Sequence, residues 1–376
     1  MRVLHVYKSY YPEDYGGVPQ AIRHLVNGCA DHGITAEVFT LSPNADDHPI
    51  QFEGHRVTQA RTVLEAASTP LSIDAFSKFR DIAPQCDLIH YHYPYPFADL
   101  LGLFCGRSIP SIVTYHSDIV RQRLLKYAYY PLQTAFLHSV DRIVCTSTNY
   151  MKTSPVLQQF IHKTEAVSLG LDQASLPKAS PEALSRWTNH SHEPFILFLG
   201  ALRNYKGIDT LIAAAKGFNF KLVIAGAGKN LDQLKDIARK DGLTNVDFVG
   251  RIDENDKAAL LELCTALVLP SHLRSEAFGL VQLEAAMKQK PLICTELGTG
   301  TSYVNEHENT GLVIPPKDVD ALRNAMNFMM YHPEVAKNMG LAAEARFKEL
   351  FTAKKMCENY TRIYHEVVAQ AKARKA

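Results

Sequence analysis

Short apolar runs alternate with amphipathic stretches along most of the chain. In the first half these runs are RVLHVY (2–7), AEVFTL (36–41), DLIHYH (87–92), SIVTYH (111–116), RIVCTS (142–147) and AVSLG (166–170). They are apolar at nearly every position, as expected of parallel strands that helices cover on both faces. We therefore predict a doubly wound α/β sheet for this half of the chain.

The pattern breaks once and then begins again. Residues 171–194 gain proline, serine and asparagine and lose the strand pattern, which is typical of a surface connector. Strand-like runs return at FILFLG (195–200), KLVIAG (221–226), VDFVG (246–250), ALVLP (266–270), PLICTE (291–296) and GLVIPP (311–316). With 376 residues the chain is long enough for two hydrophobic cores. We expect an N-terminal domain at 1–180, a second domain at 181–355, and a C-terminal helix at about 356–376 that packs on the first domain.

Open α/β sheets bind ligands at the carboxyl ends of their strands, so two such sheets are expected to share an interdomain cleft. The first strand is followed by KSYYPEDYGG and not by G-x-G-x-x-G, which disfavours a nicotinamide-dependent dehydrogenase. AGAGKN (225–230) resembles half of that motif, and we interpret it as a tight turn.

Composition mainly excludes alternatives. The 40 lysines and arginines balance 39 acidic residues, so no overall field attracts nucleic acid. The seven cysteines are scattered and mostly lie in apolar runs, which indicates reduced core residues and no zinc site or disulfide framework. The N-terminus has no signal-peptide pattern, and no apolar run is long enough to span a bilayer. We expect a cytoplasmic protein that is at most peripheral to a membrane.

The segment HLRSEAFGLVQLEAAM (272–287) follows a predicted strand and opens a helix near Gly279. The free amides and the dipole of a helix start favour a diphosphate, and glycine permits its close approach. We therefore predict that such a diphosphate binds at Phe278, Gly279 and Leu280. Glu284, within the helix, would accept ribose hydroxyls, and Glu276, before it, would meet sugar hydroxyls. The alternative is an ordinary acid before a helix and a solvated side chain within it.

Two cations, a histidine and a pair of glycines also follow predicted strands. Arg203 and Lys206, after FILFLG, would neutralise a departing diphosphate, or else they are ordinary solvated cations. His116 ends SIVTYH and is expected to point into the cleft, although a lone strand-end histidine is more often a structural group. Gly16 and Gly17 follow the first strand, where their backbone amides could reach a phosphate or sugar, unless DYGG is only a flexible turn.

The segment E-A-F-G-L-V-Q-L-E resembles the E-x7-E signature of the retaining GT-B glycosyltransferases of family 4. The resemblance extends to Gly16-Gly17, TYHSD (114–118), FLGALRNYKGIDTL (198–211) and the tail RFKELFTAKKMCENYTRIY, and so spans nearly the whole chain. It implies two Rossmann-like domains, a nucleotide-diphosphate sugar donor and transfer with retention of anomeric configuration.

The resemblance also implies roles for single residues. His116 would contact the donor sugar. Asp118 would orient His116 or meet the acceptor hydroxyl, and Lys8 is a second candidate for contact with the acceptor. Arg251 and Ile252 would clamp the nucleobase. The family pattern G-R-L-x-x-x-K-G matches Lys206 directly, whereas Arg203 corresponds only in its chemistry because Ala201 follows Gly200.

We expect neither a cofactor nor a metal. The one D-x-D pair, at Asp318 and Asp320, is better explained by a helix N-cap. Retention through a carboxylate nucleophile needs an acid beneath the anomeric carbon, and no candidate is evident. The resemblance instead implies front-face attack, in which a donor phosphate oxygen takes the proton of the acceptor hydroxyl. Arg203, Lys206, the helix amides and His116 would then stabilise the transition state.

The segment DIVRQRLLKYAYYPL (118–132) combines Arg121, Arg123 and Lys126 with leucines and tyrosines at helical spacing. It could lie on an anionic membrane surface beside a lipid-linked acceptor, or it could be a basic helix with its aromatic residues turned inward.

YHSDIVRQ, LRNYKGID and TELGTGTSYVN are similar to segments of bacterial transferases that add mannose during O-antigen or other surface-polysaccharide assembly. This implies a hexosyltransferase with GDP-mannose as donor and a glycan or lipid-linked acceptor in lipopolysaccharide biosynthesis. UDP-linked glucose, galactose or N-acetylglucosamine stays open as the donor. A UDP-sugar 2-epimerase of the same architecture and a sugar-nucleotide binding protein without turnover are the alternatives from other classes.

Overall fold

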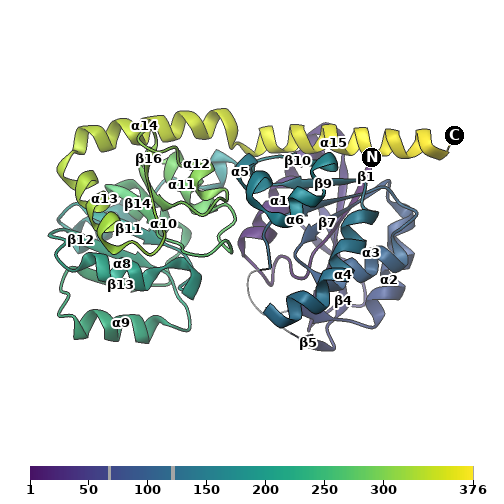
Figure 1. The fold of residues 1–376 in the computed structure, drawn as a ribbon, viewed down its shortest axis with the longest axis horizontal. Helices are drawn as coiled ribbons and strands as arrows, with labels where there is room; N and C mark the ends of the chain where they lie inside the picture. The colour runs from purple at the N-terminus through teal and green to yellow at the C-terminus, as the bar shows by residue number, and fades with distance from the viewer. Residues whose placement is uncertain (67–68, 120–122, 376) are drawn as a thin grey trace. The chain divides into compact units, whose positions relative to one another are not determined.

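The computed structural model describes residues 1–66, 69–119 and 123–375, and the chain forms two compact units (Figure 1). The first unit comprises Met1–Gly170 with Ala353–Ala376, and the second comprises Leu171–Thr352. We had expected the divisions at residues 180 and 355, whereas the structure places them after Gly170 and Thr352. Each unit is described by itself below.

The first unit is built on a sheet of eight strands in the order β10-β9-β8-β7-β1-β2-β4-β3. The strands are β1 (Arg2–Val6), β2 (Thr35–Ser42), β3 (Ile50–Phe52), β4 (His55–Arg61), β7 (Leu88–Tyr93), β8 (Ser111–Tyr115), β9 (Arg142–Cys145) and β10 (Thr164–Ala166). All neighbours pair in parallel except β3 and β4. The chain order reverses between β1 and β7, which is the switch point where such sheets leave room for ligands.

Helices of the first unit cover this sheet. They are α1 (Gly17–Cys29), α2 (Asp74–Ile82), α3 (Pro96–Cys105), α4 (Arg123–Ser139), α5 (Thr148–Thr153), α6 (Pro155–Gln159) and α15 (Ala353–Lys375), with 3-10 turns at Ala30–His32, Ala83–Gln85 and Ile161–Lys163. The C-terminal α15 packs against α1, where the Cys357 Sγ donates to the carbonyl of His24 at 3.5 Å. A long amphipathic helix at the end of the sequence thus completes the unit that the N-terminus begins.

Two details of the first unit differ from the sequence prediction. Of the predicted run 166–170, only Ala166 lies in a strand, because β10 covers Thr164–Ala166. The antiparallel β3 and its neighbour β4 were not predicted, nor was the hairpin of β5 (Leu64–Ala66) and β6 (Thr69–Leu71). These strands mix polar and apolar residues, so a search for continuous apolar runs misses them.

The second unit has a fully parallel sheet in the order β13-β12-β11-β14-β15-β16. Its strands are β11 (Phe195–Leu199), β12 (Lys221–Ala225), β13 (Val246–Gly250), β14 (Ala266–Leu269), β15 (Leu292–Thr295) and β16 (Gly311–Ile314). All six coincide with predicted runs. The order corresponds to the Rossmann arrangement, with its switch point between β11 and β14.

The helices of the second unit are α7 (Pro181–His190), α8 (Ile208–Ala215), α9 (Leu231–Lys240), α10 (Glu254–Leu263), α11 (Leu280–Met287), α12 (Thr301–Val304), α13 (Val319–Tyr331) and α14 (Pro333–Leu350), with 3-10 turns at Gln173–Ser175 and Asn204–Lys206. The connector prediction was wrong for α7. Ser180 caps it by accepting from the Ala183 amide at 3.2 Å, and Trp187 donates to Asp256 at 2.8 Å on α10. Serine followed by proline was the overlooked helix-start signal.

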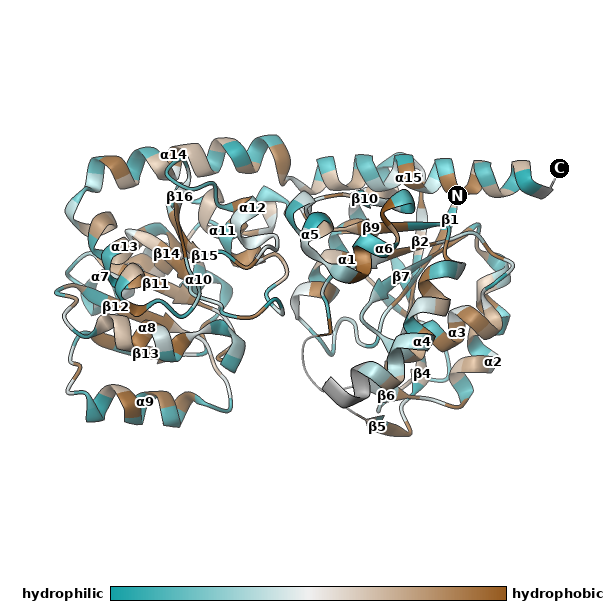
Figure 2. Cartoon of the chain, viewed as in Figure 1, coloured by the Kyte–Doolittle hydropathy of each residue, from teal (hydrophilic) through white to brown (hydrophobic). Residues whose placement is uncertain are grey.

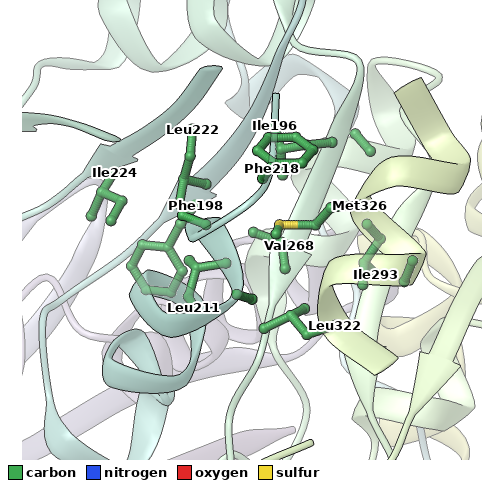
Figure 3. Packing of buried hydrophobic residues seen from close by; sticks show 14 of the residues in the cluster. Ile196, Phe198, Leu211, Phe218, Leu222, Ile224, Val268, Ile293, Leu322 and Met326 are labelled. Atoms are coloured by element: carbon green, nitrogen blue, oxygen red, sulfur yellow. The ribbon is translucent and has the colours of Figure 1, made fainter. Parts of the chain in front are cut away.

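One apolar core joins strands and helices of the second unit. Figure 3 shows strand side chains packing against helical ones, with labels on Ile196, Phe198, Leu211, Phe218, Leu222, Ile224, Val268, Ile293, Leu322 and Met326. Burying each such side chain contributes roughly 1.5–3 kcal/mol of apolar transfer free energy. Figure 2 shows the hydrophobic residues concentrated on the central strands, while α9, α14 and α15 alternate between hydrophilic and hydrophobic positions.

Candidate active site

The predicted donor-binding helix start is present in the second unit. After β14 the chain passes through a loop to Gly279, the residue directly before α11. Gly279 has a φ of +79°. A Cβ atom at Gly279 would lie 2.6 Å from the Cδ2 of Leu269, so this position requires glycine for its conformation and its packing. Phe278 is buried and Leu280 is half-buried beside it. The loop and helix start expected from E-x7-E are therefore held in a tightly packed form.

Glu276 in this loop forms an ion pair with Lys206 from the loop after β11. The side chains of Glu276 and Lys206 are only 8% and 12% exposed, and the Ser271 hydroxyl donates to the same Glu276 oxygen, Oε2, at 3.0 Å. Burial is the largest single effect on the Lys206 ammonium and lowers its pKa, but the charge and hydrogen bond of Glu276, together with Tyr205, outweigh burial, so the pKa of Lys206 is raised. The sequence predicted both residues as site residues but not their contact.

Backbone contacts hold the two loops together. The Tyr205 carbonyl accepts from the amide of His272 at 2.9 Å. Gly207 has a φ of +69°, and a Cβ atom there would lie 2.1 Å from the Pro270 carbonyl oxygen. Because the loops after β11 and β14 adjoin at the switch point, Lys206 reaches Glu276 across a distance fixed by the main chain.

Arg203 occupies a different environment from Lys206. It is exposed and lines a small cavity with Asn204, Asp209 and Asn230, at the starts of α8 and α9. Its charge is still close enough to oppose the protonation of Lys206. The structure thus gives this loop one buried, paired cation and one accessible cation.

Glu284 also pairs with a lysine. The Lys257 ammonium on α10 lies 2.9 Å from Glu284 and 2.6 Å from Glu254. Burial raises the pKa of Glu284, and Lys257 opposes that shift only in part. The sequence analysis did not identify Lys257.

Arg251 and Ile252, the predicted nucleobase contacts, lie between β13 and α10; Arg251 is exposed and Ile252 is half-buried. Asp253 caps α10 by accepting from the Asp256 amide at 2.8 Å. The helix α10 begins just after Arg251 and Ile252, and its Lys257 pairs with Glu284. One helix therefore links the residues predicted to bind the nucleobase to the residue predicted to bind the ribose.

In the first unit, Gly16 and Gly17 begin α1 and are exposed. The Gly16 amide donates to the Asp14 carboxylate at 2.8 Å, and the Ser9 hydroxyl donates to that carboxylate at 2.6 Å. A carboxylate therefore accepts from the amide of the residue before α1, where the helix dipole favours negative charge. Lys8, after β1, is half-buried.

His116 belongs to a buried group of four histidines that the sequence analysis did not recognise. The His92 Nδ1 lies 3.0 Å from His116 Nε2, and the His5 Nδ1 lies 3.0 Å from His92 Nε2. Burial lowers the pKa of His5 and of His116 to about 3, and burial with neighbouring histidines lowers the pKa values of His90 and His92 well below the usual value. The available signal was a histidine at inward positions of RVLHVY, DLIHYH and SIVTYH.

Asp118 contacts other groups. Its Oδ1 accepts from the Tyr115 hydroxyl at 2.9 Å and from the Ser154 hydroxyl at 2.8 Å. We had expected Asp118 to orient His116 or to meet the acceptor. The side-chain hydrogen bond that the structure shows for His116 is with His92, which lies on the neighbouring strand.

His5, His90 and His92 offer ring nitrogens within 4.8 Å of one another and could hold a metal ion. Imidazole suits zinc, copper or nickel. The His90 and His92 rings, however, stack with centroids 4.2 Å apart, whereas ligation directs in-plane lone pairs at one point. Both ring nitrogens of His90 and of His92 are also already engaged in hydrogen bonds. Asp318 of the D-x-D pair caps α13, as predicted, by accepting from the Ala321 amide at 2.9 Å.

The basic and aromatic segment 118–132 lies in part outside the described residues, which exclude Arg121 and the side chains of Arg123 and Lys126. Tyr127 and Tyr130 on α4 are exposed by 78% and 41%, while the Tyr129 hydroxyl donates inward to Asp99. None of the described helices is both long enough and apolar enough to cross a bilayer.

Two family models match the chain: "Glycosyltransferase Family 4" over residues 15–153 and "Glycosyl transferases group 1" over residues 181–346. D-rhamnosyltransferase WbpZ of Pseudomonas aeruginosa is 48% identical over 94% of this chain and 93% of that protein. O-antigen chain mannosyltransferase C of Escherichia coli is 44% identical over 97% of this chain and 98% of that protein. Sucrose-phosphate synthase from Thermosynechococcus elongatus shares the fold, with a TM-score of 0.81 and 22% identity over 98% of this chain and 99% of that chain.

We predict that Lys206→Met lowers the free energy of unfolding by about 3–5 kcal/mol, because Glu276 is left buried without its partner. The matched control is Lys348→Met, which breaks an ion pair whose lysine is 53% exposed. That control should cost less than about 1 kcal/mol. The double variant Lys206→Met with Glu276→Gln should be less destabilised than the sum of the single variants. Urea unfolding of the wild type and of the four variants, Glu276→Gln alone among them, measures these costs, and equal costs for the two lysines would contradict the prediction.

Proposed function

The chain belongs to the family 4, or group 1, glycosyltransferases and has the GT-B fold, and we propose that it transfers mannose from GDP-mannose to a glycan acceptor in bacterial O-antigen assembly. The observation that carries the sugar assignment is the agreement of two relatives along nearly the whole chain. One is named for mannose and the other for D-rhamnose. D-rhamnose is 6-deoxy-D-mannose, so both sugars share the manno configuration.

The geometry of the second unit supports donor binding there. Both described contacts of the Glu276 carboxylate use Oε2, so Oε1 is the oxygen that would accept from a sugar hydroxyl. The Lys206 ammonium, kept charged by Glu276, would stabilise the diphosphate as it departs. Phe278, Gly279 and Leu280 would present the α11 amides to that diphosphate, and Glu284 would hold the ribose, with Arg251 and Ile252 at the base.

We also propose that transfer retains the anomeric configuration and needs no divalent metal. Lys206 and Arg203 supply the positive charge that a metal would bring to the diphosphate. The acceptor hydroxyl would attack from the side on which the diphosphate leaves, with a phosphate oxygen taking its proton. His116 and the amides of Gly16 and Gly17, in the first unit, would contact the sugar or its phosphate, and Asp118 and Lys8 are candidates for the acceptor.

Transfer from GDP-mannose should exceed transfer from UDP-glucose, UDP-galactose and UDP-N-acetylglucosamine. GDP should also raise the melting temperature more than UDP at equal concentration, because a ligand that binds only the native state stabilises it. GDP-D-rhamnose, tested beside GDP-mannose, separates the two sugars. A selective response to UDP and UDP-sugars would overturn the donor assignment, and glycal release without transfer would instead indicate the epimerase.

The stereochemistry and the metal requirement have their own test. The product from α-linked GDP-mannose should show an α-anomeric signal in proton NMR, and the rate should be unchanged after treatment with EDTA. A β-linked product would contradict retention. Loss of activity in EDTA that added Mg²⁺ or Mn²⁺ restores would contradict metal independence.

We further propose that the protein acts in the cytoplasm at an anionic membrane surface, through residues 118–132, on a lipid-linked acceptor. The exposed Tyr127 and Tyr130 support this proposal. The protein should co-float with vesicles that contain phosphatidylglycerol, less so with pure phosphatidylcholine, and less at high salt. Tyr127→Ser should weaken co-flotation, whereas Tyr331→Ser, at a residue 57% exposed in the second unit, should not. Equal binding by both variants would contradict the assignment.

A further inference from the structure

Three of the buried histidines form a continuous hydrogen-bonded row, which we call the histidine file. It consists of His5 on β1, His92 on β7 and His116 directly after β8, whose side chains are almost fully buried. Each of its two hydrogen bonds has a nitrogen-to-nitrogen distance of 3.0 Å. These strands are neighbours in the order β8-β7-β1, so the file runs across the sheet at the switch point of the first unit.

The fourth histidine, His90, lies outside the file. It precedes His92 by two residues on β7 and therefore shares its face of the sheet. Its Nδ1 lies 2.8 Å from the Tyr364 hydroxyl, and its Nε2 lies 2.6 Å from the Thr114 hydroxyl. Both nitrogens are thus engaged by other groups, and His90 only contacts the file through ring stacking.

The chemistry of neutral imidazole restricts the protons in the file. Burial keeps the rings uncharged, because the pKa values of His5 and His116 are lowered to about 3. A neutral ring has one N–H donor and one acceptor nitrogen. His92 uses both of its nitrogens, so it must donate to one neighbour and accept from the other. Only two proton arrangements are consistent with the file, one running in each direction.

The two arrangements differ in which end of the file carries the outward N–H, His116 Nδ1 in one and His5 Nε2 in the other, and among the described residues no hydrogen bond is shown for either nitrogen. Buried N–H groups are rarely left without an acceptor. The proposed sugar contact supplies an acceptor at His116 and none at His5, so it favours the arrangement in which His5 donates from Nδ1 to His92 Nε2. His92 then carries its proton on Nδ1 and donates to His116 Nε2. His116, having accepted at Nε2, carries its own proton on Nδ1.

We propose that the histidine file fixes His116 as a neutral hydrogen-bond donor with its proton on Nδ1, so that His5 and His92 are positioning residues for the sugar contact. In this form His116 recognises an acceptor oxygen, whether of a sugar hydroxyl or of a phosphate. The choice of tautomer and its kinetic consequence rest on the proposed function, whereas the two hydrogen bonds of the file do not.

The test is a long-range proton–nitrogen NMR spectrum of the full chain labelled with nitrogen-15 at histidine, with His116 assigned by its loss in His116→Gln. The wild-type protein should show His116 neutral and protonated at Nδ1. In His92→Phe this pattern should change, because no neighbour then directs the proton. In His90→Phe, on the same strand and equally buried, the His116 pattern should stay as in the wild type.

Activity provides the second readout. His92→Phe should lower kcat/KM on the order of 10-fold, as expected for one misdirected hydrogen bond, while His90→Phe stays within about 2-fold. A wild-type His116 that is charged or protonated at Nε2 overturns the proposal. So does an unchanged His116 signal in His92→Phe, or one transition-metal ion per purified chain that His90→Phe removes. If no donor is turned over, the proposed function fails while the spectrum still decides the tautomer.

Discussion

A charge that is buried in a protein must be paired, and in the second unit this requirement joins the loops that follow β11 and β14. An unpaired ammonium or carboxylate loses several kcal/mol of hydration on burial, so neither Lys206 nor Glu276 is stable there without the other. The pair explains the close backbone contact between the loops. Gly207 must pass within reach of Pro270 for the two side chains to meet. The ion pair therefore fixes the chain path into α11, and with it the helix start proposed to bind the diphosphate.

Glycines at the ends of neighbouring strands extend this arrangement. A Cβ atom at Gly226 would lie 1.9 Å from the Gly200 carbonyl oxygen, and one at Gly228 would lie 2.3 Å from that of Leu202. The segment AGAGKN is thus a turn, as predicted, and it packs against the loop that carries Arg203 and Lys206. Its likeness to a dinucleotide motif has a structural cause, since both need backbone to approach without intervening side chains.

The sequence was most informative where a feature is local. Continuous apolar runs identified all six strands of the second unit, and Glu276, Gly279 and Glu284 mark a loop and a helix that exist as predicted. Contacts between distant segments were not readable. Lys257 comes 27 positions before Glu284, and nothing in either local pattern indicates that they pair. The sequence prediction missed α7 because the polar composition of 171–194 was given more weight than the cap at Ser180. Trp187 gives that helix a buried face.

The histidines also could not be recognised as a group from local sequence, and they avoid an unpaired buried charge in a different way from the ion pairs. His5, His92 and His116 each looked like a single histidine in a strand, and only the strand order makes them neighbours. The second unit buries charges and pairs them, whereas the first unit buries titratable rings and keeps them neutral. The hydroxyls of Tyr360 and Tyr364 on α15 contact Thr114 and His90 at 2.8 Å, beneath the same strands. Because neutral buried rings depend on the exclusion of water, the C-terminal helix contributes to this environment by covering His90, whose ring stacks on that of His92.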